Sequence, residues 1–588
     1  MRAAATVPRL PQRPVRVLEN IDVARIFEQI ADLLEIQGGN PFRIRAYRNA
    51  ARTIGTLSVP VASLAGKDKA LEELPGIGAD LAGKIREIVQ TGTLPLLAQL
   101  TRRTPHTVVE LMHVPGLGPK RAKLVYQKLH IKSLDDLEVA ARAGKLRKVR
   151  GFKEGLERRV LQGLADRKAH GGRIGLATAD AYAAPLIAYL KKLPGVRRLE
   201  VAGSYRRRVE TVGDLDILIA ASRGAEVGAR FVAYPDVSQV LAEGTTRCSV
   251  VLACGIQVDL RVVPAVSFGA ALHYFTGSKA HNIAVRALGL KRGLKINEYG
   301  VFRGTRRVAG RREEEVFASV GLPWIPPELR ENRGELDAAR THALPSLVEL
   351  GDIKADLQMH TTYTDGVNDL EEMVKAAAQR GYEYIAITDH TKSVRVAGGL
   401  GRSGFQKQWR EIEGLQKRVP GLTILKGAEV DILEDGRLDL DDATLAHVDL
   451  VIASVHSKLN MPKTAMTRRL LRALAHPRVH ILGHPTGRLL GKREPSTLDM
   501  EAIVEAAVAH GVMLEINAQP DRLDLNDIYV RMARDASALL VISSDAHRTE
   551  ELKFLRYGVD QARRGWCEPR HVANTRNLAD FRKLLRRA

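Results

Sequence analysis

Three aspartates near the middle of the chain have the types and spacing needed for metal-dependent chemistry on phosphates. Asp214 and Asp216 lie two residues apart in GDLDILIA, and in a strand such residues point to the same face. Neighbouring carboxylates repel each other unless a cation lies between them. Asp259 adds a carboxylate within the apolar run IQVDLRVV. Three such groups can hold two Mg²⁺ or Mn²⁺ ions for in-line phosphoryl transfer, which makes all three candidate catalytic ligands. The first pair alone fits a solvent-facing strand equally well.

The segment just before these aspartates could bind a triphosphate. Gly203 and Ser204 can turn backbone and hydroxyl donors toward phosphate oxygens, and Arg207 can neutralise their charge. The order of a Gly-Ser turn, an arginine and then paired aspartates favours the catalytic interpretation over the solvent-facing strand.

A second set of polar residues recurs beyond residue 355, where strand-like runs end in His, Asp or Glu. In a parallel α/β barrel the carboxyl ends of the strands share one face, so these residues would converge. Imidazole and carboxylate together suit Mn²⁺, Zn²⁺ or Fe²⁺, and two or three such ions can activate water and clamp a phosphate. Arg488 is a candidate phosphate clamp or an ordinary surface arginine. The expected metal ligands are His360, Asp365, His390, Glu429, His456, His484, Asp545 and His547.

Two short repeats in the first part of the chain share the frame apolar-Pro-Gly-apolar-Gly, namely LPGIGADLAGKI and VPGLGPKRAKLV. The glycines allow a tight turn, and the next helix begins with free N–H groups that suit a phosphate oxygen. The repeats resemble the helix-hairpin-helix motif, which binds the DNA backbone without reading sequence. The expected DNA contacts are Gly76, Gly78, Gly116, Gly118 and Lys120.

Charge is distributed unevenly along the 588 residues. Residues 1–350 hold 55 Lys and Arg against 35 Asp and Glu, a net charge of +20, whereas residues 351–588 hold 35 against 33, a net charge of +2. A basic part of this kind favours a polyanionic partner such as DNA, with solubility as the simpler alternative. Three scattered cysteines without a CxxC pair, and no long apolar run, indicate a cytoplasmic protein without a membrane partner.

The elements that must position these groups change along the chain. From Ile21, the run IDVARIFEQIADLLEIQG has helical spacing, and further small helices follow it. Beyond residue 173, short β-like runs separated by glycines predict a mixed sheet. After a polar segment that contains Pro345, seven strand-then-helix units predict an α/β barrel or a related parallel sheet.

The middle of the chain resembles the nucleotidyltransferase palm of family X DNA polymerases, the relatives of polymerase β. The resemblance rests on GS, RR and GDLD and continues through HYFTGSKAHN and INEYGVFR. It implies that the three aspartates bind the catalytic metals and that Gly203, Ser204, Arg207 and Gly213 contact the incoming nucleotide. The residues it implies for the sugar and base are Tyr274, Phe275, Gly277 and Asn282. The residues it implies for the template side or for closure are Arg286, Asn297, Glu298 and Tyr299.

The last part resembles the PHP (polymerase and histidinol phosphatase) domain that bacterial members of this family carry. The resemblance implies metal-dependent 3′–5′ exonuclease activity and, in some members, cleavage at abasic sites. Gln358 stands where the first histidine of an HxH pattern is expected. Because Gln is a weak Zn²⁺ ligand, one metal is expected to bind poorly or to differ in identity. Lys84 matches a lysine that some relatives use as a Schiff-base nucleophile, although a phosphate contact is the more ordinary role.

These observations predict a multidomain α+β and α/β protein with a helical helix-hairpin-helix region, a mixed-sheet palm and a C-terminal PHP (β/α) barrel. The expected parts are a flexible tail (1–16), a lyase-like helical domain (17–95), a helix-hairpin-helix domain (96–170), the palm (171–263), a thumb-like subdomain (264–333), a linker (334–350) and the PHP domain (351–588).

The function that this organisation predicts is short-gap DNA synthesis in repair, with a 3′–5′ exonuclease in the barrel. The expected partners are gapped or primer-template DNA and deoxynucleoside triphosphates, and the expected state is a nucleoid-associated monomer. Two alternatives remain at this point. One is a phosphoesterase that uses the basic part only to find DNA, and the other is a non-catalytic DNA-binding scaffold with structural metals.

Overall fold

The structure is a computed structural model that describes most of residues 20–585. The gaps are 57–60, 68, 75, 105–107, 109–110, 112–113, 115–116, 118, 150–151, 153, 159, 162–163, 165–172, 253–254 and 491–492.

The N-terminal region is helical, as its 3.6-residue periodicity predicts. Phe27 of the first helix packs edge-on against Tyr47 of the second with ring centroids 5.5 Å apart, inside an apolar core that the small helices share. The described helices are α1 (Asn20–Gln37), α2 (Pro41–Thr56), α3 (Val61–Ala65), α4 (Ala79–Thr91), α5 (Pro95–Arg103), α7 (Pro119–Leu129), α8 (Leu134–Arg142) and the 3₁₀ turn η2 (Leu146–Lys148).

The first glycine repeat forms the turn that its sequence predicts. Gly76 has a φ of 78°, a left-handed conformation that favours glycine, and Gly78 is the N-cap residue of α4. In the second repeat, Gly116 and Gly118 lie outside the described residues, as does the side chain of Lys120. The DNA contacts expected of both repeats stay predictions.

The palm contains the expected sheet. Five strands are hydrogen-bonded in the order β2-β4-β7-β6-β5, and a short antiparallel pair, β1 with β3, lies outside that sheet. The strands are β1 (Ile174–Gly175), β2 (Val196–Val201), β3 (Thr211–Val212), β4 (Asp214–Ala221), β5 (Val237–Glu243), β6 (Arg247–Leu252) and β7 (Gln257–Val262). The helices are α10 (Leu176–Lys191), α11 (Gly203–Arg206) and α12 (Gly224–Val232).

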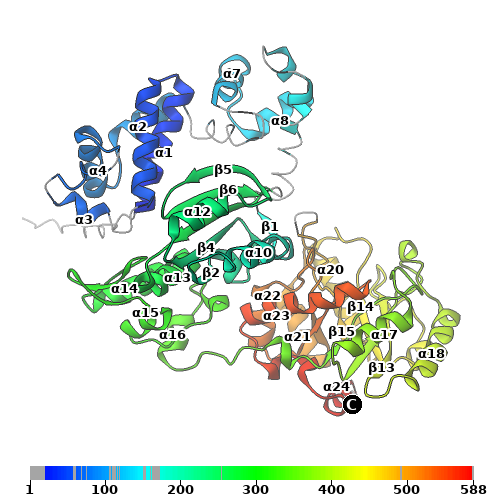
Figure 1. The fold of residues 1–588 in the computed structure, drawn as a ribbon. Coiled ribbons are helices and arrows are strands. Elements are labelled where there is room, and N and C mark those ends of the chain that lie inside the picture. Colours follow the sequence, from blue (N-terminus) through cyan, green and yellow to red (C-terminus); the bar gives the residue numbers. More distant parts are fainter. Residues whose placement is uncertain are drawn as a thin grey trace, which may run out of the picture. The chain divides into compact units, whose positions relative to one another are not determined.

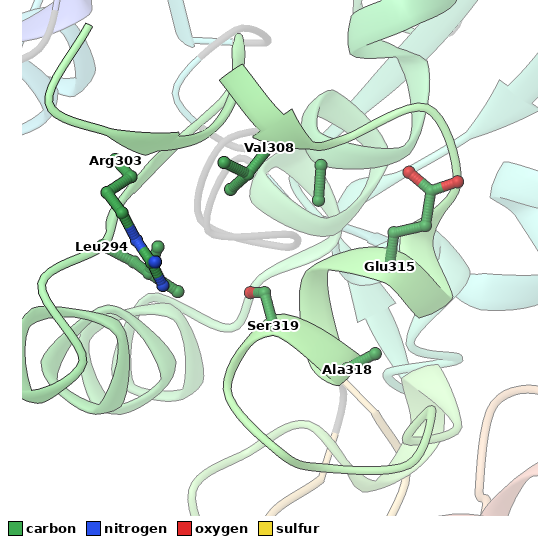
Figure 2. Close-up of a pocket in the computed structure, with 7 residues that line it drawn as sticks. Leu294, Arg303, Val308, Glu315, Ala318 and Ser319 are labelled. Atoms are coloured by element: carbon green, nitrogen blue, oxygen red, sulfur yellow. The ribbon is translucent and has the colours of Figure 1, made fainter. Parts of the chain in front are cut away.

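The thumb-like part combines helices with a three-stranded antiparallel sheet, β8 (Lys295–Asn297), β9 (Gly300–Arg303) and β10 (Arg306–Ala309). A hollow of about 380 Å³ lies between this sheet and α15 (Glu313–Ser319). Residues that line it include Arg303, Val308 and Ser319 (Figure 2). None of the residues predicted to bind nucleotide lines it. The helices are η3 (Ala265–Ser267), α13 (Phe268–Thr276), α14 (Lys279–Lys291), α15 (Glu313–Ser319), η4 (Pro327–Leu329) and α16 (Glu335–Arg340).

The C-terminal part is the predicted barrel, with seven parallel strands hydrogen-bonded in sequence order. Figure 1 shows helices around the strands of this part. Beyond the last strand, the backbone N–H of His360 donates to Ala546 at 2.8 Å, and a parallel bridge joins Met359 to Ala546. These contacts bring the first and last strands together at their carboxyl ends. The strands are β11 (Ala355–Asp356), β12 (Tyr384–Ile387), β13 (Thr423–Asp431), β14 (Leu450–Ser454), β15 (Ile481–Leu482), β16 (Met513–Asn517) and β17 (Leu540–Ser543).

Helices cover the outside of the barrel strands, and all strand residues except Thr423 and Lys426 are buried because the sheet is covered on both faces. These helices are α17 (Leu370–Gln379), α18 (Arg402–Gln416), α19 (Asp442–Leu445), α20 (Lys463–Leu474), α21 (Met500–His510), α22 (Asp527–Asp535), α23 (Leu555–Arg564) and α24 (Leu578–Leu585). The 3₁₀ turns are η5 (Leu350–Asp352), η6 (Arg395–Ala397), η7 (Thr549–Phe554), η8 (Pro569–His571) and η9 (Ala573–Thr575). Among the described helices of the whole chain, none combines the length and apolarity that a membrane span needs.

Candidate active sites

The carboxyl ends of the barrel strands gather the predicted metal ligands. Three overlapping groups have ligand atoms within 4.8 Å of one another. They consist of His360, Asp365, His390 and His547; of His390, Glu429 and His456; and of His360, Glu429 and Asp545. His484 joins them through Glu429, since the histidine Nε2 lies 2.9 Å from the carboxylate Oε1. All eight predicted ligands therefore meet in one cluster.

The spacing within this cluster fits bound divalent ions. Two ligand atoms at about 2.1 Å from one ion lie roughly 3.0 to 3.4 Å apart at octahedral or tetrahedral angles. Glu429 Oε2 lies 3.1 Å from His390 Nδ1 and 3.4 Å from His360 Nε2, and Glu429 Oε1 lies 3.3 Å from His456 Nε2. Glu429 thus has Oε2 toward His360 and His390 and Oε1 toward His456 and His484, so both of its oxygens could hold metal.

Several buried ligand atoms of the cluster make no hydrogen bond in the described part of the chain. They are His360 Nδ1, His390 Nδ1, His484 Nδ1 and Glu429 Oε2. A buried polar atom without a partner costs about 1 to 3 kcal/mol, which a metal ion would offset where such an atom coordinates it. The donor set of imidazoles and carboxylates fits Mn²⁺, Zn²⁺ or Fe²⁺.

The pKa values of the cluster's histidines shift in opposite directions, because burial and neighbouring histidines lower them while carboxylates raise them. Burial lowers the pKa of His360, and the neighbouring His547 and His390 lower it further. Burial alone would also lower the pKa of His547, but Asp365 and Asp545 raise it to about 10. For His456, Glu429 and Asp431 outweigh burial and raise the pKa to about 9. His456 and His547 therefore favour their protonated forms, and a cation that binds their ring nitrogens would displace those protons.

Two residues that the sequence analysis missed hold ligands in place. Asp431 Oδ1 lies 3.2 Å from His456 Nδ1 and also accepts the backbone N–H of His456 at 3.1 Å. Asn517 Nδ2 donates to Asp545 Oδ2 at 3.0 Å. The sequence contained a clue to each residue. Asp431 is two residues beyond Glu429 on the same strand, so both side chains lie on one face. Asn517 ends the one barrel strand to which no ligand was assigned.

Gln358, where the sequence departs from HxH, is fully buried beside the cluster. Its Nε2 donates to Asp545 Oδ1 at 3.4 Å, while its Oε1 makes no hydrogen bond among the described residues. The expectation that one metal binds differently here stays a prediction. Arg488, the candidate phosphate clamp, is buried and pairs with Glu210 at 2.6 Å, so its role toward phosphate also stays a prediction.

The three palm aspartates come together as predicted. Asp214 and Asp216 begin β4, Asp259 lies in the neighbouring β7, and their carboxylate oxygens lie within 4.8 Å of one another. Asp259 is buried and accepts hydrogen bonds from Ser249 and Gln257. Asp214 is exposed and Asp216 is half-buried, so the group opens to solvent on one side. Three oxygen donors at this separation fit Mg²⁺ or Mn²⁺.

Gly203 is required next to this group. Its φ is 67°, and a Cβ atom at this position would lie 3.1 Å from Asp216 Oδ2. Any larger residue would be strained and would crowd the carboxylate. The turn that carries Ser204 can therefore approach the aspartates closely, as a phosphate-binding turn beside a metal site must.

The residues predicted to bind the nucleotide are linked by side-chain contacts. Arg207 Nη1 donates to the carbonyl of Thr276 at 2.6 Å, and Asn282 Nδ2 donates to the carbonyl of Tyr274 at 2.7 Å. The rings of Tyr274 and Phe275 lie edge to face, 4.9 Å apart. Gly277 has a φ of 70°. These contacts order the end of α13 and the turn after it.

The remaining predicted residues lie in the thumb-like part, just before β4 and on α4. Asn297 Oδ1 accepts the backbone N–H of Tyr299 at 3.0 Å in the turn between β8 and β9, and Glu298 lies in the same turn. Arg286 lies on α14 and Gly213 precedes β4. Lys84, on α4, pairs with Asp80 and lies 5.4 Å from the ring centre of Tyr47. Its use as a nucleophile stays a prediction.

Family models match four parts of the chain. Residues 18–94 match the helix-hairpin-helix domain, 108–166 the SAM-like helix-hairpin-helix tandem, 271–331 the DNA polymerase beta thumb, and 356–519 the PHP domain. With the palm aspartates and the barrel cluster, these matches define the class as a polymerase β-type protein with a C-terminal PHP domain.

Relatives of known name narrow this class. "DNA polymerase/3′-5′ exonuclease PolX" of Bacillus subtilis (strain 168) is 38% identical over 576 residues, which cover 96% of this chain and 99% of the relative. This chain belongs to the PolX family. Two probable phosphatases match a smaller share. One from Syntrophotalea carbinolica is 26% identical over 38% of this chain and 91% of its own length, and YcdX of Escherichia coli O127:H6 is 31% identical over 33% and 78%.

Proposed function

We propose that this protein is a DNA-directed DNA polymerase that fills short gaps during repair, working on gapped or primer-template DNA in the bacterial cytoplasm. The observation that carries the proposal is the meeting of Asp214, Asp216 and Asp259 beside the Gly203 turn. Membership of the PolX family supports it. The helix-hairpin-helix regions would hold the DNA backbone, and the excess positive charge of residues 1–350 would strengthen that contact.

In this mechanism the residues of the chain bind and orient the two reactants. The Gly203 turn and Ser204 donate hydrogen bonds to the triphosphate, and Arg207 neutralises its charge. Tyr274 and Phe275 contact the sugar and base. Two Mg²⁺ or Mn²⁺ ions held by the aspartates would lower the pKa of the primer 3′-hydroxyl and stabilise the charge of the pyrophosphate leaving group.

The test of this function is nucleotide addition to a gapped primer by the wild type and by Asp214→Ala. Loss of one metal ligand should reduce incorporation by at least about 100-fold and leave DNA binding intact, because the aspartate does not contact the DNA backbone in this mechanism. Asp236→Ala is the matched control, since Asp236 is an exposed aspartate of the same domain. Normal incorporation by Asp214→Ala would reject the palm assignment.

We propose further that the barrel is a 3′–5′ exonuclease that trims DNA ends with two or three Mn²⁺, Zn²⁺ or Fe²⁺ ions. The overlap of its ligand groups supports this, because His360, His390 and Glu429 each belong to two groups. Metal ions held there would activate water and stabilise charge on the scissile phosphate. Asp431 and Asn517 would keep His456 and Asp545 oriented.

Replacement of His390 should separate the two activities. His390→Ala removes a ligand from two groups at once, so end trimming with Mn²⁺ should be lost while primer extension persists. His447→Ala is the matched control, because His447 is an exposed histidine of the same barrel. Unchanged trimming of a labelled single strand by purified His390→Ala would count against the barrel assignment.

A further inference from the structure

An arginine of the barrel contacts the residue proposed to hold the triphosphate. Arg564 is the last residue of α23, and its side chain is only 5% exposed. Its Nη1 donates to the backbone carbonyl of Arg207 at 2.8 Å and to Glu331 Oε1 at 3.0 Å. Its Nη2 donates to Asp527 Oδ2 at 2.7 Å. The guanidinium is therefore fixed by three acceptors.

Glu331 is shared between two arginines. The same oxygen, Oε1, accepts from Nε of Arg207 at 3.0 Å and from Nη1 of Arg564 at 3.0 Å. Arg207 uses its Nη1 for the carbonyl of Thr276, which leaves its Nη2 without a partner among the described residues. Arg564 thus contacts Arg207 in two ways, directly at its carbonyl and through Glu331 at its guanidinium.

The charges of this group depend on Arg564. Asp527 also pairs with Arg333 at 2.9 Å, so the connected set has three positive and two negative members. The set has a net charge of +1, which is available to an anion at Arg207. Without Arg564 the net charge falls to zero, because Glu331 then neutralises Arg207 alone. Arg564 is buried, and Arg207, Glu331 and Asp527 are half-buried, so solvent screens such a change only partly; Arg333 is exposed.

We propose that Arg564 is a positioning residue of the polymerase site. It balances the charge of Glu331 and so leaves Arg207 oriented and positive for the triphosphate. The barrel thereby contributes to nucleotide binding as well as to its own chemistry. This inference rests on the proposed role of Arg207 in nucleotide binding.

The competing explanation is that Arg564 only holds α23 against its neighbours and does not affect nucleotide binding. A variant of the neighbouring Arg563 can distinguish these two explanations. Arg563 forms an ion pair with Glu328 at 2.8 Å and donates to the carbonyl of Val348 at 3.0 Å. It makes no contact with Arg207 or Glu331 in the described part of the chain. Arg563→Gln therefore removes a comparable ion pair without changing the charge at Arg207.

The experiment measures nucleotide affinity of the full-length protein in two ways. Calorimetry with deoxyadenosine triphosphate and Ca²⁺ gives binding without turnover, and gap filling with Mg²⁺ gives KM and kcat. Arg564→Gln should raise Kd and KM roughly tenfold, because a charge-assisted contact is lost, and should leave kcat unchanged. Arg564→Lys keeps the charge and should bind within about threefold of the wild type. In the E331Q background, Arg564→Gln should have a smaller effect on affinity than in the wild type, because the negative charge that Arg564 balances is already absent.

Exonuclease activity and metal content of the Arg564 variants should equal those of the wild type, which establishes that the barrel is folded. The inference is overturned if Arg564→Gln leaves Kd unchanged, if Arg564→Lys is as weak as Arg564→Gln, or if Arg563→Gln weakens binding equally. A wild type that binds the triphosphate but adds no nucleotide would refute the proposed function alone, and the Kd values would still decide the role of Arg564. A wild type without triphosphate binding would overturn both.

Discussion

At the scale of single residues, the chemistry of the barrel depends on the side chains that contact each candidate metal ligand. Glu429 serves two ligand groups with its two oxygens, and His456 is held between Glu429 and Asp431. Because a metal-bound histidine uses one ring nitrogen, the hydrogen bond at the other nitrogen fixes the tautomer and the ring orientation. Asp431, whose Oδ1 lies 3.2 Å from His456 Nδ1, would fulfil this role for His456.

Asp431→Asn should lower the affinity of the barrel for Mn²⁺ by about 10- to 100-fold, because His456 loses a charged partner that fixes its orientation. Titration of the metal-loaded protein with a chelator, followed by metal analysis, measures this change. Asp449→Asn is the control, since Asp449 accepts a backbone N–H from Lys426 at 2.9 Å and touches no predicted ligand. Equal metal retention by the two variants would show that Asp431 does not hold His456.

At the scale of elements, the Gly203 turn is anchored to the thumb by a buried ion pair. Glu313, at the start of α15, pairs with Arg206 of α11 at 2.8 Å and with Arg330, and accepts from Trp324 Nε1 at 2.7 Å. Arg330 is fully buried, so Glu313 is its necessary counter-charge. Burial alone would raise the pKa of Glu313, but Arg330 and Arg206 hold it well below its usual range.

Glu313→Gln should destabilise the thumb by about 3 kcal/mol near pH 7, because it leaves Arg330 buried without a counter-charge. The lowered pKa means that this stabilisation is complete above the unfolded pKa of about 4.3 and is lost as pH falls below it. The difference between wild type and variant should therefore shrink in acid. Hydrogen exchange of the α13 and α15 amides at pH 7 and the pH dependence of Trp fluorescence measure both effects.

The neighbouring Glu314→Gln is the control for this prediction, since Glu314 is exposed on the same helix. It should leave the exchange rates of α13 and α15 unchanged. Equal protection of those amides in Glu313→Gln and the wild type would contradict the anchoring role of Glu313.

At the scale of the whole molecule, the net positive charge and the candidate metal ligands are distributed differently along the sequence. Both parts hold a group of residues that could bind metal, yet the excess of positive charge belongs to residues 1–350. A polyanion gains most from contacts that release its counterions, so the first part of the chain should supply most of the affinity for DNA.

Binding of a gapped duplex should therefore weaken at least about tenfold when NaCl rises from 50 to 200 mM, as expected for two or more neutralised phosphates. Fluorescence anisotropy of a labelled duplex, measured with Ca²⁺ to prevent turnover, gives the slope. His390→Ala should show the same slope, because the barrel cluster is not part of this contact. An affinity independent of salt would mean that backbone phosphates are not the main contact.

Much of this molecule could be predicted from periodicity and residue type. The seven barrel strands place His360, His390 and Glu429 at carboxyl ends, and parallel strands bring such ends together whatever their separation in sequence. The i, i+2 spacing of Asp214 and Asp216 likewise fixes their common face once the segment is a strand. The local sequence pattern and the regular geometry of strands are sufficient to predict that these residues come together.

Only the tertiary structure decided which charged residues of different elements pair with each other. Arg488 pairs with Glu210, and Arg564 shares Glu331 with Arg207, although 357 positions separate the two arginines. Such pairs obey no short period, because they depend on which helix packs against which turn. The sequence by itself therefore determined the elements and the candidate ligands at their ends. Three-dimensional packing decided which charges meet, since an ion pair forms wherever folding brings its two groups within about 4 Å.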